Sequence, residues 1–293
     1  MHRRSVFSAI AALLAMIAIA VTSLAVNPSG AGAQTNPFQR GPAPTLASIQ
    51  ATTGPFATQQ FTVNSGNGFG GGTITAPTDT SQGTFGAIVF VPGFTAAASN
   101  YTWVGSRIAS QGFVVFVINT NSRFDMVPAR STQQKAALTF LTGSSSPVAS
   151  RIDKTRLAVS GHSMGGGGTL MTAAGDSTLQ AALPLMPWNN STTNFSGDKD
   201  PTMIVGAQND NIAPVNQHAI PFYNSIPASS HKAYLELAGQ GHNVGTTSNT
   251  TQSQFYIAWM KSYVDNDSRY FQFICPPPAT SSTISAYMNT CPP

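Results

Sequence analysis

The segment Gly161-His162-Ser163-Met164-Gly165, which three more glycines follow, constrains the fold more than any other part of the chain. The apolar residues 157–160 before it predict a buried strand, and residues 169–174 after it predict a helix. A serine on a G-x-S-x-G turn between a strand and a helix adopts a strained backbone, and glycines let the two elements approach closely. The pattern therefore predicts that Ser163 is a nucleophile.

A glycine-rich loop before a helix can also bind phosphate through its backbone amides. A phosphate-binding loop of that kind carries a lysine after the last glycine, whereas here Thr169 follows Gly168. This difference favours the nucleophile interpretation.

The N-terminus has the three parts of a secretory signal peptide. Residues 1–4 form a basic n-region, residues 6–26 are almost uninterruptedly apolar, and Ala31-Gly32-Ala33 supplies an A-x-A cleavage site. We expect cleavage of residues 1–33 and an extracellular catalytic domain over residues 34–293. An uncleaved membrane anchor is the alternative, because the apolar run is nearly long enough to span a bilayer.

The composition of the mature chain excludes one large class of functions. Charged residues make up 8% of the chain, and the net charge falls from +4 to near +2 because Arg3 and Arg4 leave with the signal. This charge is too low for a nucleic-acid-binding surface. We therefore expect no nucleic-acid partner. We also expect a monomer and no membrane association after signal cleavage.

The two cysteines, Cys275 and Cys291, are both near the C-terminus. In an exported protein they are expected to form a disulfide bond. The loop between them is short, so the bond would contribute roughly 3 kcal/mol by restraining the C-terminal segment. A metal-binding or catalytic thiol is not favoured, because no histidine is close to either cysteine in the sequence.

Strand and helix patterns alternate along the mature chain, which has a length typical of one large domain. This alternation predicts a single-domain α/β fold with a mostly parallel sheet covered by helices on both faces. Residues 34–44 are expected to form a loosely held entry strand or arm. Residues 61–63 and 72–75 predict an antiparallel pair; further strands are expected at 87–91, 114–118, 157–160, 181–185, 203–205 and, as the last one, 234–237, and helices at 99–110 with Ser99 as N-cap, 133–141 and 255–264.

A serine nucleophile needs a histidine base, and elimination identifies one. His162 is on the turn itself, where its side chain should diverge from that of Ser163. His218 is expected on a helix, and His231 is in a polar run before a strand. His242 follows the last predicted strand, which is where the chain order Ser, Asp, His places the base.

The acid that orients the base is predicted to be Asp210. It follows the strand at 203–205, at the carboxyl edge of the sheet where active sites collect. Its neighbours are asparagines, so a turn-forming role is the alternative. The sole glutamate, Glu236, is inside the last predicted strand, and Asp198 and Asp200 precede a strand, which makes all three weaker candidates.

The oxyanion formed during ester attack requires two backbone amide donors. The amide of Met164, which follows the nucleophile, and that of Phe94, in a loop after an early strand, are the expected pair. The side chains of Phe94 and Met164, with Trp188 and Ile212, would form an apolar wall of the cleft, although any of them could instead belong to the core.

Six motifs in chain order resemble the bacterial cutinase and poly(ethylene terephthalate) hydrolase family, and together they cover essentially the whole mature chain. The resemblance implies a lidless α/β-hydrolase that cleaves esters in cutin, in aliphatic and some aromatic polyesters, and in short-chain substrates. The motifs are Val91-Pro92-Gly93-Phe94-Thr95, Gly161 to Gly167, Pro187-Trp188-Asn189, Asn209 to Pro214, Ala258-Trp259-Met260-Lys261 and Val264 to Tyr270.

Carried over position by position, the resemblance implies a triad of Ser163, Asp210 and His242, with the amides of Phe94 and Met164 as oxyanion donors. Trp188 corresponds to the aromatic residue that stacks on a terephthalate ring. The substrate-binding set that we predict comprises Phe94, His162, Met164, Trp188, Ile212 and Asn243.

Several positions depart from the pattern of the family. Ala207 and Val244 replace the cysteines of members with a second disulfide, and Gln208 and Ala238 replace the acidic residues of calcium-binding relatives. We therefore expect no metal site, no cofactor and only moderate thermal stability. Asn243 stands where relatives usually carry Phe or Ser, so the width of the cleft is open.

Two alternatives to a secreted polyester-cleaving serine esterase remain. A triacylglycerol lipase would use the same mechanism but usually carries an apolar lid helix, for which the sequence offers no candidate insertion. A catalytically inactive surface-binding protein of the same fold would be expected to lose members of the triad, all of which are present here.

Overall fold

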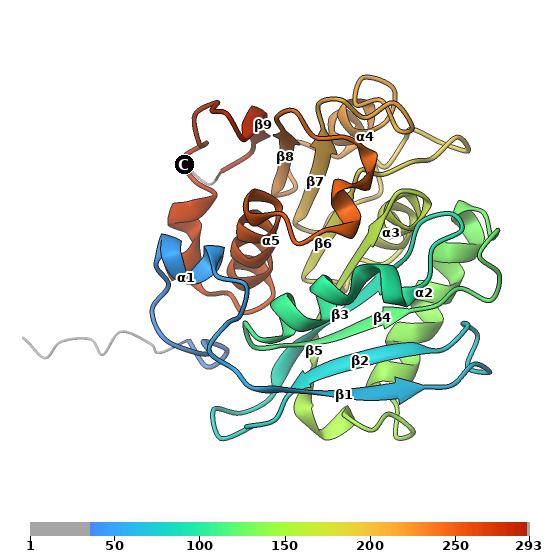
Figure 1. The fold of residues 1–293 in the computed structure, drawn as a ribbon, viewed down its shortest axis with the longest axis vertical. Helices are drawn as coiled ribbons and strands as arrows, with labels where there is room; N and C mark the ends of the chain where they lie inside the picture. The colour runs from blue at the N-terminus through green and yellow to red at the C-terminus, as the bar shows by residue number, and fades with distance from the viewer. Residues whose placement is uncertain (1–35, 292–293) are drawn as a thin grey trace, which may run out of the picture. The chain divides into compact units, whose positions relative to one another are not determined.

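One sheet of nine strands organises residues 36–291, the part of the chain that the computed structural model describes. The six strands from β4 to β8 in the sheet are parallel, and antiparallel strands close both edges (Figure 1). The strands in sheet order are β1 (Thr58–Val63), β2 (Gly72–Pro77), β4 (Phe113–Ile118), β3 (Phe85–Val91), β5 (Ile152–His162), β6 (Ala181–Leu185), β7 (Thr202–Ala207), β8 (Lys232–Leu237) and β9 (Ile284–Asn289).

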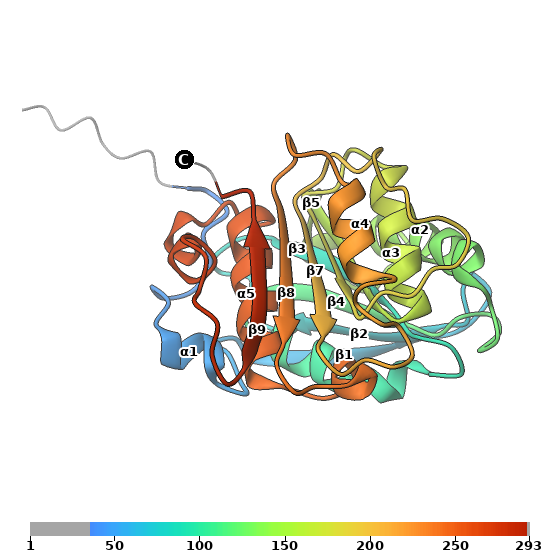
Figure 2. The same ribbon diagram turned by 90° about the horizontal axis from the view of Figure 1, so that it is seen from above.

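Helices cover both faces of this sheet, as the alternating sequence pattern predicts (Figure 2). Helix α5 and the irregular segment of residues 98–109 pack on one face, and α2, α3 and α4 pack on the other. The α/β class is thus confirmed. The helices are α1 (Leu46–Gln50), α2 (Val127–Thr142), α3 (Met164–Ala174), α4 (Ala219–Ser225) and α5 (Thr250–Tyr263).

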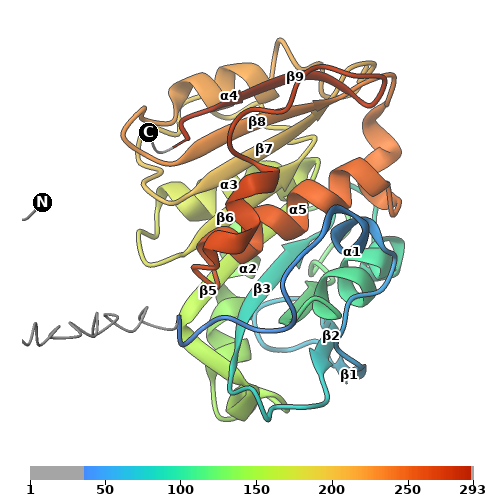
Figure 3. The same cartoon turned by 90° about the vertical axis from the view of Figure 1, so that its left-hand side faces the viewer.

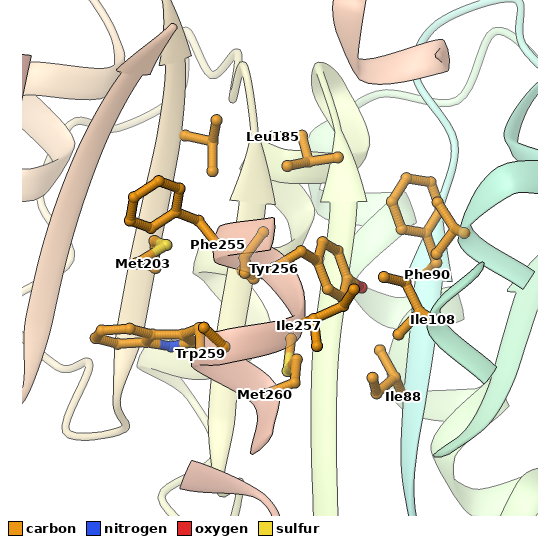
Figure 4. Close-up of a cluster of buried hydrophobic side chains, with 14 of the residues drawn as sticks. Ile88, Phe90, Ile108, Leu185, Met203, Phe255, Tyr256, Ile257, Trp259 and Met260 are labelled. Carbon is orange, nitrogen blue, oxygen red and sulfur yellow. The ribbon is translucent and has the colours of Figure 1, made fainter. Parts of the chain in front are cut away.

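Strands β3 and β4 carry no polar side chain and are buried at every position, because both of their faces are covered. In β3, Ile88 and Phe90 contact the layer of α5, whereas Val89 and Val91 contact the layer of α2. On the α5 side, the aromatic residues of the helix pack against strand side chains, as Figure 4 shows. Burial of one such side chain stabilises the fold by roughly 1.5–3 kcal/mol.

The predicted helix over residues 99–110 is wrong in its form. The structure has a 3-10 turn at Ala98–Tyr101 followed by a π-helical turn at Val104–Ile108, and Ser99 is not the N-cap. The amide of Ala98 instead donates to the side chain of Asn119, which follows β4. A tertiary hydrogen bond therefore sets the start of this segment.

The C-terminal part contains a strand that the sequence patterns did not indicate, so the prediction that residues 234–237 form the last strand is wrong. Strand β9 pairs antiparallel with β8 at the edge of the sheet, and most of its side chains are half-exposed. The predicted disulfide between Cys275 and Cys291 is present and joins the two ends of the segment that contains β9.

The first described residues are bound to the domain rather than loosely held, which corrects the expectation for residues 36–44. The side chain of Asn36 donates to the carbonyl of Asp265, and the buried guanidinium of Arg40 donates to that of Thr84. Helix α1 then lies beside α5 (Figure 3). The predicted signal peptide, residues 1–33, is outside the described residues.

Helix α2 begins at Val127, six residues before the predicted start, with a proline in its first turn.

Within residues 36–291, none of the helices has the length and apolar character needed to cross a membrane.

Candidate active site

Ser163 lies on the sharp turn between β5 and α3, with φ 58° and ψ −122°. At two positions of this turn, any residue larger than glycine would collide with the backbone. A Cβ atom on Gly165 would lie 2.1 Å from the carbonyl oxygen of Val91, and one on Gly161 would lie 2.5 Å from the carbonyl oxygen of Gly165. The glycines of the motif therefore let β3, β5 and α3 meet at the serine.

Three side chains from distant parts of the chain meet at this turn. The Nε2 atom of His242 is 2.8 Å from the Oγ of Ser163, and its Nδ1 is 2.7 Å from a carboxylate oxygen of Asp210. Each of the three residues follows a strand: Ser163 follows β5, Asp210 follows β7 and His242 follows β8. These strands are parallel, so that they bring the three side chains to the same edge of the sheet. The structure thus brings together the three residues predicted as a triad.

The carboxylate of Asp210 is held by its own loop. Its Oδ1 accepts hydrogen bonds from the amides of Ile212 at 2.9 Å and Ala213 at 2.7 Å. Burial raises the pKa of Asp210, but hydrogen bonds from His242 and these amides outweigh burial and hold the pKa below its usual range. The ionised carboxylate accepts the Nδ1 proton of His242, which leaves Nε2 free to accept the serine proton.

The amides of Phe94 and Met164 are both available to a ligand. Met164 is the first residue of α3, where an amide has no acceptor inside the helix. The amide of Phe94 has no acceptor in the described part of the chain, whereas its neighbours Gly93 and Thr95 donate to Tyr101 and Arg123. The loop after β3 is thus held on both sides of the Phe94 amide.

The surface beside Ser163 is apolar. Phe94 and Ile212 are 45% and 54% exposed. Phe94 follows Gly93, where an added Cβ would lie 3.0 Å from the Cβ of Ser163, and the amide of Ile212 donates to Asp210. Trp188 and Met164 are half-buried, and the Trp188 amide donates to the carbonyl of Ser163. Asn243, next to the base, is exposed. Five of the six predicted substrate-binding residues therefore have exposed or half-exposed side chains.

His162 is the exception, and its prediction as a cleft residue is wrong. Its side chain is buried, with Nδ1 at 2.9 Å from the hydroxyl of Tyr101 and Nε2 at 3.0 Å from the carbonyl of His242. Burial and the nearby His242 lower its pKa to about 3. The imidazole lies behind the base because Tyr101 supplies a buried partner there.

The sequence patterns missed part of the exposed apolar surface. Phe124 and Met126, in the loop between β4 and α2, are 67% and 47% exposed, and the rings of Phe124 and Phe94 pack edge to face with centroids 5.7 Å apart. Their position after the carboxyl end of a predicted parallel strand was the signal that could have identified them.

The remaining histidines occupy separate places. His218 precedes α4 and is half-buried, with its ring centroid 5.9 Å from that of Trp188, while His231 is exposed. Within residues 36–291, no three His, Cys, Asp or Glu side chains are arranged so that they could hold a metal ion.

Residues 32–292 match the model of the PET hydrolase-like family. The chain belongs to this family. It is 50% identical to a bis(hydroxyethyl) terephthalate hydrolase of Streptomyces coelicolor, in an alignment that covers 99% of this chain and 93% of the relative.

Two cutinases are similar over most of their lengths as well. A cutinase of Thermobifida fusca is 45% identical, with 99% of this chain and 98% of the relative aligned. Cutinase est1 of Thermobifida alba is 47% identical, with 88% of each chain aligned. Both relatives are named as cutinases, and membership of the PET hydrolase-like family identifies this chain as an ester hydrolase.

Proposed function

We propose that this protein is a secreted carboxylic ester hydrolase that cleaves polyesters, including aromatic ones, and short-chain esters through an acyl-enzyme on Ser163. The observation that carries the proposal is the chain of hydrogen bonds from Ser163 through His242 to Asp210. The names of the relatives, cutinases and a bis(hydroxyethyl) terephthalate hydrolase, support the choice of substrate.

In the first half of the reaction, Nε2 of His242 takes the proton from Ser163 as its Oγ attacks the ester carbonyl carbon. The resulting oxyanion accepts hydrogen bonds from the amides of Phe94 and Met164. The ionised Asp210 stabilises the imidazolium, which then donates its proton to the departing alcohol oxygen. The C–O bond of the ester breaks, and the acyl group stays on the serine.

In the second half, water replaces the alcohol. His242 takes a proton from the water as its oxygen attacks the acyl carbon, and the same two amides hold the second oxyanion. The bond to the serine oxygen then breaks, the serine regains its proton from the imidazolium, and the carboxylic acid leaves. No group beyond the side chains, two amides and water takes part in these steps.

A polymeric substrate fits the surface around the serine better than a triglyceride does. The exposed Phe94, Phe124 and Ile212 offer apolar contacts outside the catalytic turn. The connection from β6 to β7, residues 186–201, contains no helix that could act as a lid. A flat, apolar surface can contact a solid chain that cannot enter a deep pocket.

Activity measurements with two variants test the proposal. Ser163→Ala should abolish hydrolysis of p-nitrophenyl butyrate and labelling by a fluorophosphonate, while the matched variant Ser191→Ala, at an exposed loop serine, retains both. Residual activity of Ser163→Ala near that of the unmodified protein would exclude the mechanism.

A substrate comparison tests the specificity. Product release from polyester film should exceed fatty acid release from triolein at equal enzyme concentration, and the reverse order would identify a lipase. Intact mass measurement of the exported protein tests the secretion proposal, which places the first residue of the mature chain near Gln34.

A further inference from the structure

A buried line of hydrogen bonds runs behind the catalytic residues and links three loops. The amide of Gly93 donates to the hydroxyl of Tyr101 at 3.0 Å, this hydroxyl is 2.9 Å from Nδ1 of His162, and Nε2 of His162 is 3.0 Å from the carbonyl of His242. Gly93 directly precedes Phe94, and His162 directly precedes Ser163. The line therefore connects the oxyanion loop, the nucleophile turn and the base.

The hydrogen-bonding groups allow one arrangement of protons along this line. A carbonyl oxygen can only accept, so Nε2 of His162 carries the proton that bonds to the carbonyl of His242. In a neutral imidazole Nδ1 then accepts, and the donor must be the hydroxyl of Tyr101, whose oxygen accepts from the amide of Gly93. Each donor on the line then has an acceptor, so only this arrangement of protons satisfies all three hydrogen bonds.

Both side chains stay neutral over the working range of an extracellular enzyme. Burial, with a smaller contribution from His242, lowers the pKa of His162 to about 3, and burial raises the pKa of Tyr101 to about 12. The pattern of donors and acceptors is therefore constant while the proposed base His242 gains and loses its proton.

The imidazole of His162 fits tightly between the loops. Gly245 lies in the segment of residues 238–246 that follows β8 and contains His242, here called the base loop. A Cβ atom on Gly245 would lie 2.3 Å from a ring carbon of His162, and one on Gly93 would lie 3.3 Å from its Nδ1. The ring centroids of His162 and His242 are 4.8 Å apart. The indole of Trp103 also donates to the carbonyl of Gly245 at 3.1 Å, which fixes the base loop from its other side.

We propose that Tyr101 and His162 are positioning residues. They hold the amide of Phe94 and the imidazole of His242 at the positions relative to Ser163 that the reaction requires. The proposal rests on the function proposed above. The line touches none of the reacting atoms, yet it joins the two loops whose relative position sets the distance between oxyanion donors and base. Displacements of about 1 Å in such groups reduce the rate of catalysis strongly.

Single substitutions that break the line test this role. Tyr101→Phe keeps the ring and removes the hydroxyl, so kcat for p-nitrophenyl butyrate should fall about tenfold with KM changed by less than about twofold. The matched control Tyr287→Phe removes a hydroxyl that donates to the carbonyl of Ile274, far along the chain from the site, and should leave kcat unchanged. Melting temperatures of both variants show whether a loss of stability alone explains the change.

Replacements of His162 distinguish a hydrogen-bonding role from simple packing. His162→Gln retains a donor near the place of Nε2, whereas His162→Leu retains only bulk, so kcat should be several-fold higher for the glutamine variant. In the double variant of Tyr101→Phe and His162→Leu, kcat should be no lower than in the slower single variant, because either change already breaks the line.

Three outcomes would overturn the proposal: wild-type kcat in Tyr101→Phe, equal losses in His162→Gln and His162→Leu, or losses that multiply in the double variant. Because Tyr101→Phe removes a single oxygen atom, the test stands even where His162→Leu does not fold. Unmodified protein and Ser163→Ala in the same assay separate this result from a failure of the proposed function, which would show as absent activity in the unmodified protein.

Discussion

The backbone amide of Asp200 donates a hydrogen bond of 3.1 Å to the carboxyl of Asp198, and both carboxyls are buried. Asp198 also accepts from the hydroxyl of Thr202, whereas one carboxyl oxygen of Asp200 has no partner within the described residues. Within residues 36–291, neither carboxyl has a partner for an ion pair. Burial raises the pKa of Asp198 to about 6 and, together with Asp198, raises that of Asp200 to about 7.

This pair predicts a loss of stability as the pH rises. An unfolded aspartate releases its proton near pH 3.9, whereas folded Asp200 keeps it up to about pH 7, so unfolding between these values releases a proton. The free energy of unfolding should therefore fall with pH across this window. Asp200→Asn removes the contribution of Asp200, so the melting temperature of the variant relative to the unmodified protein should be higher at about pH 8 than at about pH 5.

The exposed carboxyl of Asp79 provides the control for this prediction. Hydrogen bonds from Ser81 lower the pKa of Asp79, so Asp79→Asn should show no relative gain in melting temperature as the pH rises. An Asp200→Asn variant with the same pH dependence as the unmodified protein would contradict the assignment.

Replacement of Asp210 by Asn is expected to lower kcat by about 10³-fold or more, with KM for a short-chain ester nearly unchanged. The amide side chain can donate to Nδ1 of His242, which moves the imidazole proton to Nε2 and prevents that atom from accepting the serine proton. Steady-state kinetics on p-nitrophenyl butyrate measures the effect. Asp200→Asn, which changes the charge of an aspartate outside the proposed triad, should retain kcat.

Replacement of Gly165 by Ala should prevent formation of the native turn. The added Cβ would lie 2.1 Å from the carbonyl oxygen of Val91, in backbone that cannot move without shifting β3. We expect loss of soluble, active protein. Gly175→Ala, at the end of α3, places its Cβ 3.2 Å from the flexible end of Lys135 and should retain both yield and activity. An active Gly165→Ala protein would show that the turn has more space than the structure indicates.

Removal of the disulfide should destabilise the protein without inactivating it. Replacing both Cys275 and Cys291 by serine is expected to lower the free energy of unfolding by roughly 3 kcal/mol, because the bond closes a short loop. The segment it closes contains β9, which pairs with β8 at the edge of the sheet and supplies none of the proposed catalytic residues. Denaturant unfolding measures the loss, and unchanged kcat at low temperature distinguishes it from damage to the site.

The sequence determined the features that depend on short-range patterns. Continuous apolar runs such as residues 87–91 indicate strands covered on both faces, and the glycines around Ser163 indicate a turn that only glycine allows. Chain order then selected Asp210 and His242, because parallel strands bring their carboxyl ends to one edge whatever the loops do.

Tertiary contacts decided the rest. His162 is buried because Tyr101 and the carbonyl of His242, which are 61 and 80 residues away in the chain, accommodate both ring nitrogens. Strand β9 exists because β8 offers an unpaired edge, and its half-exposed residues carry no strong apolar pattern. A side chain at a turn can reach either solvent or the interior, and the partners that choose between them come from parts of the chain that only folding brings together.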